Sequence, residues 1–320
     1  MQTLPPFVEP LGHGVHAIDT GFHRDRFDAA YLLVHGGRAA FIDTGTNHAV
    51  PRLLEALAAL GIARDAVDHV IPTHVHLDHA GGAGLLMREL PRATLVVHPR
   101  GARHMIDPAV LYQGALAVYG QAEMDRSYGR LVGIDAERVT TTHDGMVLEV
   151  AGRPLRFADT PGHARHHHCV WDAVTCGWFT GDTFGLSYRE FDNADGQPWI
   201  FPTSTPVQFN PPALRASIER LVSLDPSCVY VTHYGRLEGV RRLADMLLSQ
   251  LDAMVAIARR LRDAADRHQA LKQGLLALYR DRLRAHGCRL PDERIDELLA
   301  LDVQLNAQGI EVWLDRPASR

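Results

Sequence analysis

Six residues decide the fold and the chemistry of this chain: His74-Val75-His76-Leu77-Asp78-His79. They follow the apolar run Val67–Ile71, which predicts a strand, and they precede Gly81-Gly82, which predicts a turn into a helix. Three imidazoles and one carboxylate therefore crowd a single loop. Because zinc and similar cations prefer imidazole nitrogen and carboxylate oxygen, the loop predicts a metal site.

Three further strand-like runs end in a residue that can bind a metal, namely His163, Asp182 and His233. If these strands lie side by side or in two packed sheets, their ends can converge at one edge. The edge would then carry five histidines and two aspartates around a shared cavity. Seven such ligands exceed what one four-coordinate site can use, so the pattern predicts two metal ions.

This arrangement resembles the metallo-β-lactamase superfamily, whose pattern is His-x-His-x-Asp-His, a distant His, a bridging Asp and a final His. The match covers roughly residues 10–236 and includes three other segments of signature type: Phe41–Gly45, Thr160–His163 and Phe179–Thr183. The resemblance implies an α/β fold, the αββα sandwich of that superfamily. We expect this catalytic domain over residues 1–236, with a helical insertion at about 99–138 and a C-terminal helical appendage over 237–320.

The resemblance also assigns the ligands. It implies that His74, His76 and His163 hold the first ion, and that Asp78, His79 and His233 hold the second. Asp182 would bridge the two ions, so Asp78 and Asp182 are the expected catalytic residues. Water between two divalent cations loses a proton near neutral pH and becomes a nucleophile, and Asp78 would steer it or carry a proton. Zinc is the expected metal, and iron(II) and manganese(II) suit the same ligands.

Several side chains near the motif have more than one interpretation. Asp43 matches a carboxylate that orients a metal-bound histidine, or it simply forms the turn before Thr44-Gly45. His166, His167 and His168 are not assigned to metal. Four tyrosines are expected either to line a substrate pocket or to pack in the core: Tyr112, Tyr119, Tyr128 and Tyr188. Cys169, Cys176 and Cys228 are expected to be small buried hydrophobes.

The secondary structure follows from apolar periodicity. Strands are predicted at 31–34, 39–42, 67–71, 94–97, 147–150 and 155–158, with a hairpin turn at Gly36-Gly37. Helices are predicted at about 50–60, 82–90 and 212–223, and the Pro-rich residues 198–212 predict a long surface loop. Beyond residue 236 an apolar stripe marks one long helix, followed by helices near 267–286 and 291–304. Trp313 and Leu314 are expected after the last of them.

The predicted activity is hydrolysis of a small ester-like bond, in a lactone or a thioester, as in the acyl-homoserine lactonase and glyoxalase II branch. One alternative is a mononuclear iron enzyme of the persulfide dioxygenase type. The other is a regulatory or ligand-binding protein that acts through its C-terminal helices. A true β-lactamase is disfavoured, because no secretion signal is evident and Asp78-His79 fits the lactonase branch.

Composition limits the partners. The 320 residues carry 33 Lys and Arg against 38 Asp and Glu, for a formal net charge of −5, and no basic run suggests nucleic acid. No segment offers about 18 uncharged apolar residues, so we expect no membrane contact. Four irregularly spaced cysteines fit reduced thiols in the cytoplasm. The apolar stripe of the last 80 residues needs a cover: its helices fold back onto the sandwich, roof the active site or pair two subunits, and a homodimer is the prediction.

Overall fold

The computed structural model describes residues 4–316, and the chain divides into two compact units. The first unit contains the residues up to Asp159 together with His166–Gly181 and Ser227–Glu238. The second contains Thr160–Arg165, Asp182–Pro226 and the residues from Gly239 onward. The domain boundary expected between residues 236 and 237 stays a prediction.

A seven-stranded sheet of the first unit runs in chain order, with antiparallel pairing from β1 to β4 and parallel pairing from β4 to β7. Its strands are β1 (Val8–Gly12), β2 (Val15–Asp19), β3 (Ala29–His35), β4 (Arg38–Ile42), β5 (Val67–Ile71), β6 (Thr94–Val97) and β7 (Val139–Thr141). Gly36 and Gly37 join β3 to β4, and both have positive φ, of 54° and 76°. A two-residue turn with positive φ at both positions matches the strand twist, so the hairpin is confirmed.

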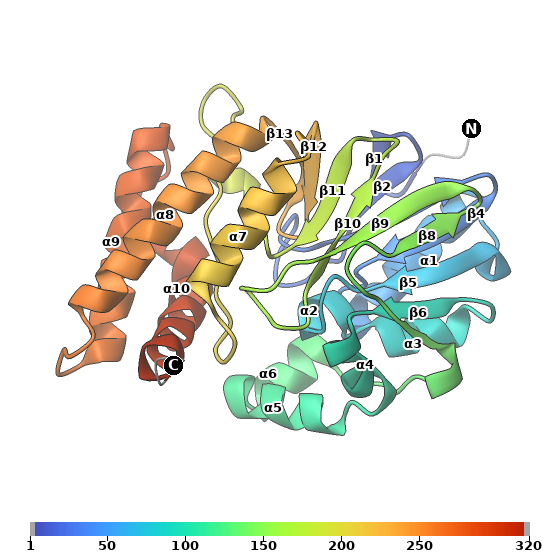
Figure 1. Ribbon diagram of the computed structural model, residues 1–320, viewed down its shortest axis with the longest axis horizontal. Coiled ribbons are helices and arrows are strands. Elements are labelled where there is room, and N and C mark those ends of the chain that lie inside the picture. Colours follow the sequence, from blue (N-terminus) through green and yellow to red (C-terminus); the bar gives the residue numbers. More distant parts are fainter. Residues whose placement is uncertain (1–3, 317–320) are drawn as a thin grey trace. The chain divides into compact units, whose positions relative to one another are not determined.

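A second sheet of the same unit has the strand order β13-β12-β11-β10-β9-β8. Its strands are β8 (Val147–Val150), β9 (Arg153–Asp159), β10 (His168–Asp172), β11 (Gly177–Gly181), β12 (Cys228–Val231) and β13 (Gly235–Glu238). Only β11 and β12 pair in parallel, and the other neighbours are antiparallel. Both sheets are labelled in Figure 1.

Apolar side chains of the two sheets form one core between them. The Tyr31 ring of β3 lies 5.3 Å from the Phe179 ring of β11 and 5.6 Å from the Tyr230 ring of β12. Successive strand residues point to opposite faces, so Phe41 faces away from this core while its neighbour Ile42 faces into it. The packed core fixes the strand ends from which the predicted ligands project.

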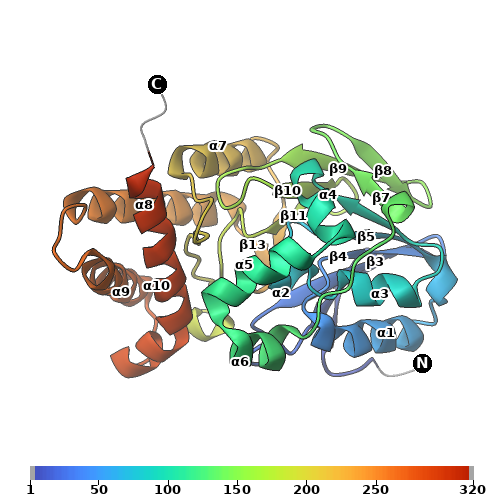
Figure 2. The same cartoon turned by 90° about the horizontal axis from the view of Figure 1, so that it is seen from below.

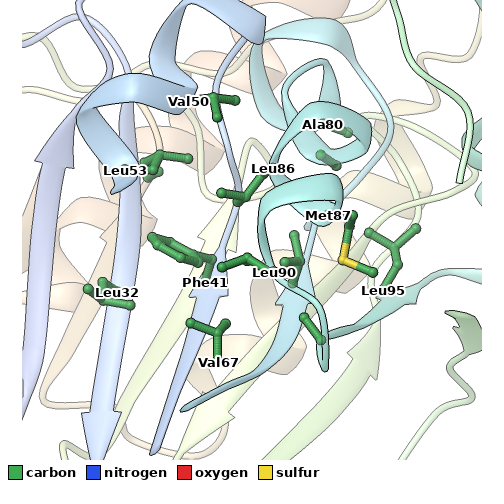
Figure 3. Packing of buried hydrophobic residues seen from close by; sticks show 14 of the residues in the cluster. Leu32, Phe41, Val50, Leu53, Val67, Ala80, Leu86, Met87, Leu90 and Leu95 are labelled. Atoms are coloured by element: carbon green, nitrogen blue, oxygen red, sulfur yellow. The ribbon is translucent and has the colours of Figure 1, made fainter. Parts of the chain in front are cut away.

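The outer face of the seven-stranded sheet is covered by α1 (Val50–Ala59) and α3 (Ala83–Glu89). Figure 3 shows Leu53 of α1 and Leu86 of α3 packed over Phe41, and all three are fully buried. Leu53, Ala56 and Leu57 recur at three- and four-residue spacing, which places them on one helix face. The sandwich with helices on this outer face agrees with the predicted α/β fold class.

The expected insertion at about 99–138 is helical. It contains α4 (Pro99–Ile106), α5 (Ala109–Tyr119), α6 (Gln121–Glu123) and a π-helical turn at Met124–Tyr128. The loop that carries the His-x-His-x-Asp-His motif leads into the short helix α2 (Leu77–Ala80). Gly81 and Gly82 then connect α2 to α3, as the sequence predicts.

The second unit contains α7 (Pro211–Val222), α8 (Val240–Arg260), α9 (Arg267–His286) and α10 (Asp292–Asp315), visible in Figure 2. Asp266 caps α9 by accepting a hydrogen bond from the Gln269 amide, and Gly287 ends it in the left-handed conformation. The apolar stripe of α8 is buried within the chain at Leu243, Leu247, Leu251 and Met254. This stripe therefore needs no partner subunit to cover it.

Two expectations about the second unit are wrong. The last helix extends to Asp315 rather than ending near residue 304, so Trp313 and Leu314 lie within it. The Pro-rich stretch is largely buried, with Trp199, Ile200 and Phe201 all inaccessible to solvent. Gln250 of α8 donates a hydrogen bond to the Ile200 carbonyl at 2.5 Å. The residues next to Ile200 in the sequence cannot reveal a partner that lies 50 residues away. Among residues 4–316, no helix combines the length and apolar character needed to cross a bilayer.

Candidate metal centre

The first two motif histidines lie in the loop after β5. His74 Nε2 is 2.7 Å from His76 Nδ1, and the His74 ring is fully buried. Thr73 Oγ1 lies 3.2 Å from His74 Nδ1. Because Nδ1 has a neighbour in Thr73, the other ring nitrogen of His74 is directed toward His76.

The second set of ligand atoms belongs to Asp78, His79 and His233, all in the first unit. One ligand atom from each lies within 4.8 Å of the others. Asp78 Oδ2 is 3.7 Å from His79 Nε2 and 3.4 Å from His233 Nε2. The end of β12 and the start of α2 thus bring a carboxylate and two imidazoles together, which is the convergence that the sequence predicts.

The Asp43 carboxylate orients His79, one member of this second set of ligand residues. This carboxylate lies 2.8 Å from His79 Nδ1 and accepts hydrogen bonds from the Thr73 amide at 2.7 Å and the Thr232 hydroxyl at 2.7 Å. The side chain is buried, and its φ of 56° is unusual for a residue with a side chain. Asp43 therefore orients a ligand histidine, as one of its two interpretations has it, and it also forms the turn after β4.

The tautomers of His79 and His233 follow from their partners. His79 Nδ1 donates to the Asp43 carboxylate, and His233 Nδ1 donates to the Phe27 carbonyl at 2.8 Å. A carboxylate or a carbonyl can only accept, so each ring carries its proton on Nδ1. Both Nε2 atoms then present a lone pair toward Asp78. This is the arrangement that orients metal-binding histidines in proteins.

The second unit supplies the remaining two predicted residues. His163 Nε2 lies 3.3 Å from Asp182 Oδ2, and both side chains are buried. His163 Nδ1 donates to the Thr203 carbonyl at 3.3 Å. Asp182 follows the last residue of β11 directly, and Thr160–His163 lies just beyond β9. His163 thus resembles His79 and His233 in using Nδ1 for orientation.

Asp28 is a buried carboxyl group that the sequence analysis did not single out. Burial raises the pKa of Asp28 from 3.8 to about 8, and the neighbouring His233 and His79 only partly oppose this. Thr20 Oγ1 donates to Asp28 Oδ2 at 3.0 Å, while Oδ1 has no hydrogen-bond partner among the described residues. Asp28 is therefore protonated at neutral pH, beside the residue whose carbonyl holds His233.

The three histidines left unassigned by sequence support the motif loop. The His167 ring stacks on His74 at 4.8 Å, and His166 Nδ1 accepts a hydrogen bond from the Val75 amide at 3.4 Å. His168 contacts the Thr142 hydroxyl at 3.1 Å, and burial lowers the pKa of His168 to about 3. None of the three belongs to a cluster of metal-binding type within residues 4–316.

Three of the four tyrosines lie in the insertion, namely Tyr112, Tyr119 and Tyr128, and Tyr188 lies in the second unit. Tyr112 lines a cavity of about 610 Å³ in the insertion, together with Asp107, Pro108, Ala109, Gln113, Asp125, Gly129, Arg130 and Leu131. Tyr119 packs on Tyr128 at 5.2 Å, and Tyr128 packs on Phe22 at 5.4 Å. Tyr188 is buried in the second unit, where its hydroxyl donates to Asp302 at 3.0 Å. Tyr188 is therefore a packing residue.

One cysteine expectation is wrong. Cys169 and Cys228 are buried as expected, whereas Cys176 is exposed. Cys176 lies outside the strands, in the turn between β10 and β11, where its φ is 47°.

The sequence analysis also missed two threonines that hold Asp43. Thr73 and Thr232 both hydrogen-bond to its carboxylate, and each directly precedes a ligand histidine. The repeated Thr-His pair at the ends of two distant strands was a signal that could have identified them. Within each unit the candidate donor atoms are carboxylate oxygens and imidazole nitrogens. The nitrogen is Nε2 wherever Nδ1 is engaged, as in His79, His233 and His163, whereas His76 presents Nδ1 toward His74. That donor set fits divalent zinc, iron or manganese.

Comparison with known proteins agrees with this geometry. Residues 23–233 match the model of the metallo-beta-lactamase superfamily. The metallo-beta-lactamase fold-containing protein ST1585 of Sulfurisphaera tokodaii is 25% identical over 69% of this chain and 78% of its own. The solved structure of ST1585 superposes with a TM-score of 0.64 at 20% identity, over 93% of this chain and 98% of that one. The structural likeness shows the fold.

Two relatives have enzyme names. A hydroxyacylglutathione hydrolase of Acidiphilium cryptum is 29% identical over 73% of this chain and 76% of its own. An atrochrysone carboxyl ACP thioesterase of Aspergillus fumigatus is 31% identical over 48% of this chain and 38% of its own. The names of both relatives describe enzymes that hydrolyse thioesters.

Proposed function

Because the chain belongs to the metallo-β-lactamase superfamily, we propose that it is a dinuclear metal-dependent hydrolase of a small ester-like substrate, a thioester or a lactone. The observation that carries the proposal is the convergence of Asp78, His79 and His233, with both imidazoles fixed through Nδ1. Hydroxyacylglutathione hydrolase and thioesterase relatives support the thioester class. Free cysteines and the lack of a candidate membrane helix among the described residues are compatible with a cytoplasmic enzyme.

In this proposal, His74, His76 and His163 would hold one ion, while Asp78, His79 and His233 would hold the other. Asp182 would be shared by both. When bound, two divalent cations lower the pKa of coordinated water to near neutral and so make hydroxide available as the nucleophile. Zinc is the proposed metal, with iron(II) and manganese(II) as substitutes.

The protein side chains supply orientation and proton transfer. Asp43 keeps the His79 proton on Nδ1, and the Phe27 carbonyl does the same for His233. The Asp78 side chain is 25% exposed, whereas the flanking imidazoles of His79 and His233 are 0% and 4% exposed. Asp78 is therefore the most exposed ligand of this set, and its carboxylate would pass a proton to a leaving group.

The insertion is the proposed binding region for the acyl part of the substrate. Its cavity of about 610 Å³ has the size of a small-molecule site. A series of ring contacts connects the insertion to the candidate metal ligand His233. The Tyr128 ring packs on the Phe22 ring. The centre of the Phe22 ring lies 5.8 Å from that of Phe27, which lies 5.2 Å from that of His233. These contacts pack the insertion against the residues that support His233.

Metal counting combined with an anaerobic activity panel tests the proposal. We expect about two transition-metal ions per reconstituted chain. We also expect hydrolysis of a thioester or lactone without oxygen, with a rate that rises with pH through neutrality. Asp78→Asn should lower turnover, whereas Asp159→Asn, an exposed carboxylate bonded to His98 at 3.2 Å, should not.

Two experimental results would contradict the proposal and indicate another function. One iron per chain with oxygen-dependent release of sulfite would identify a persulfide dioxygenase. Two bound metals without turnover of any thioester, lactone or phosphodiester would favour a regulatory protein that acts through its C-terminal helices.

A further inference from the structure

A network of hydrogen bonds in the second unit joins the C-terminal helix α10 to the loop Pro202–Thr205. The Ser204 amide donates to Asn306 Oδ1 at 2.7 Å, and Asn306 Nδ2 donates to the Pro202 carbonyl at 3.4 Å. The Ser204 hydroxyl donates to the Asn306 carbonyl at 3.3 Å. One residue of α10 therefore holds the loop backbone on both sides of Thr203.

The same loop contacts His163 twice. His163 Nδ1 donates to the Thr203 carbonyl at 3.3 Å, and Thr205 Oγ1 donates to the His163 carbonyl at 3.0 Å. The first contact fixes the ring tautomer, and the second fixes the backbone that carries the ring. The position of the loop therefore sets the direction of His163 Nε2, which lies 3.3 Å from Asp182 Oδ2.

Asn306 is poorly explained by packing alone. It is completely buried on a helix whose other buried positions are mostly apolar, and its amide also donates to Tyr279 Oη at 3.0 Å. Burying an amide costs free energy unless its polar atoms are bonded, and the atoms of Asn306 are bonded. Two of these bonds are to the loop that holds His163.

Gly309 gives independent support from the same helix. A Cβ added at this position would lie 2.3 Å from Ser204 Oγ and 2.4 Å from the Thr205 carbonyl oxygen. Any side chain at residue 309 would therefore push the loop away from α10. The hydrogen bonds of Asn306 and the close approach at Gly309 thus both involve loop residues near Thr203, namely Pro202, Ser204 and Thr205.

We infer that Asn306 is a positioning residue for His163, acting through the Pro202–Thr205 loop, and that α10 is part of the metal-binding machinery. The inference rests on the proposed role of His163 as a ligand. Removing the side chain of Asn306 frees the loop, weakens the Nδ1 hydrogen bond of His163 and lets the ring adopt its other tautomer. The Nε2 lone pair is then no longer held in place for the metal.

The first test is a nuclear magnetic resonance measurement on metal-free protein with ¹⁵N-labelled histidine. The His163 signals are assigned from their loss in His163→Gln. At a pH high enough to keep the ring neutral, we expect the wild type to favour the tautomer protonated at Nδ1, which bonds to Thr203, over the tautomer protonated at Nε2, which faces Asp182. In Asn306→Ala the ratio of the two tautomers should shift by about fivefold, the equivalent of one net hydrogen bond. Tyr279→Phe removes the other bond of the Asn306 amide and should leave the tautomer unchanged.

The second test is metal affinity by chelator competition on the full-length chain, with zinc alone. Asn306→Ala should weaken the His163 site about tenfold, at the low end for residues that orient ligands. Tyr279→Phe should stay within about twofold of the wild type. Gly309→Ala displaces the same loop sterically and should reproduce the shift in both measurements, so the inference remains testable if Asn306→Ala does not fold.

Wild-type tautomer ratios and zinc affinities in both Asn306→Ala and Gly309→Ala would overturn the inference. That result differs from failure of the proposed function. If His163→Gln left the zinc content unchanged, the metal assignment would be wrong, whereas the tautomer measurement needs no metal and would still report on the loop.

Discussion

Asp43→Asn should weaken metal binding and destabilise the fold by similar free energies, whereas an equally buried carboxylate away from the ligands should affect the fold alone. The substitution keeps the shape of the side chain and one acceptor oxygen for the Thr73 amide. It places an amide NH₂ where the carboxylate accepts from His79 Nδ1 and Thr232 Oγ1. Two donors cannot face each other, so His79 must move its proton to Nε2, the nitrogen directed toward Asp78.

The magnitude follows from the bonds that are changed. Loss of a partner that orients a metal-bound histidine costs about 10- to 100-fold in affinity, or roughly 1.4 to 2.7 kcal/mol. The stability cost should be about 1.5 to 3 kcal/mol, the range for one hydrogen bond to a charged group. Thr73 and Thr232 can each keep a partner, because hydroxyls donate or accept.

Asp172→Asn provides a matched control in the same unit. Asp172 is also fully buried, and it accepts from Arg153 Nε at 2.9 Å within a buried ion pair. Breaking such a pair costs about 3 to 5 kcal/mol, because an uncompensated charge stays buried. We expect Asp172→Asn to be the less stable variant in chemical denaturation and to retain wild-type zinc affinity in chelator competition. If the two variants lose affinity in proportion to their lost stability, Asp43 has no orienting role.

Three other predictions concern charge, ligation and assembly. In the folded state Asp28 keeps its proton up to about pH 8, whereas in the unfolded state it loses the proton near pH 4. Between these two pH values the folded state binds more protons than the unfolded state. The free energy of unfolding of metal-free protein should therefore fall as pH rises from about 4 to about 8, by at most about 1.4 kcal/mol per pH unit. Asp28→Asn should flatten that profile in urea titrations, and an unchanged slope would show that Asp28 is not the group responsible. Asp182→Ala should lower metal content and turnover together, whereas Cys176→Ala, at an exposed turn, should alter neither; full activity of Asp182→Ala would remove it from the site. The homodimer stays a prediction from sequence alone, because the α8 stripe that suggested it is covered within the chain; light scattering at twice 35.4 kDa would support it, and a single-chain mass at every concentration would rule it out.

The strands that carry the candidate ligands were predictable from sequence because the signal is local. Val67–Ile71 is an apolar run of strand length followed at once by a His-rich loop, and the observed β5 has the same bounds. Val229–Val231 and Gly177–Gly181 similarly end beside His233 and Asp182. In each case the residues that form the strand end within three residues of the candidate ligand in the sequence.

The environment of the 198–212 stretch was not predictable in this way. Its prolines and polar residues favour an exposed loop, yet Trp199 and Phe201 stack at 5.0 Å and Phe201 lies 5.4 Å from the Tyr279 ring. Burial here depends on α8, α9 and α10, which begin at residue 240 and beyond. The extension of α10 to Asp315 has the same origin, because Ile310 and Leu314 are buried by tertiary contacts.

The orientation of the ligands illustrates the limit most clearly. Three histidines donate from Nδ1 to acceptors 36, 206 and 40 residues away: Asp43 for His79, Phe27 for His233 and Thr203 for His163. Only the first acceptor is a side chain. The other two are backbone carbonyls, which every residue possesses, so no residue type at positions 27 or 203 could reveal them. A sequence motif thus identifies which atoms can bind a metal, whereas the fold determines which nitrogen of each ring is available to do so. Mutational analysis of such a site must therefore reach residues like Asn306, whose effect on a ligand passes through a carbonyl that cannot itself be substituted.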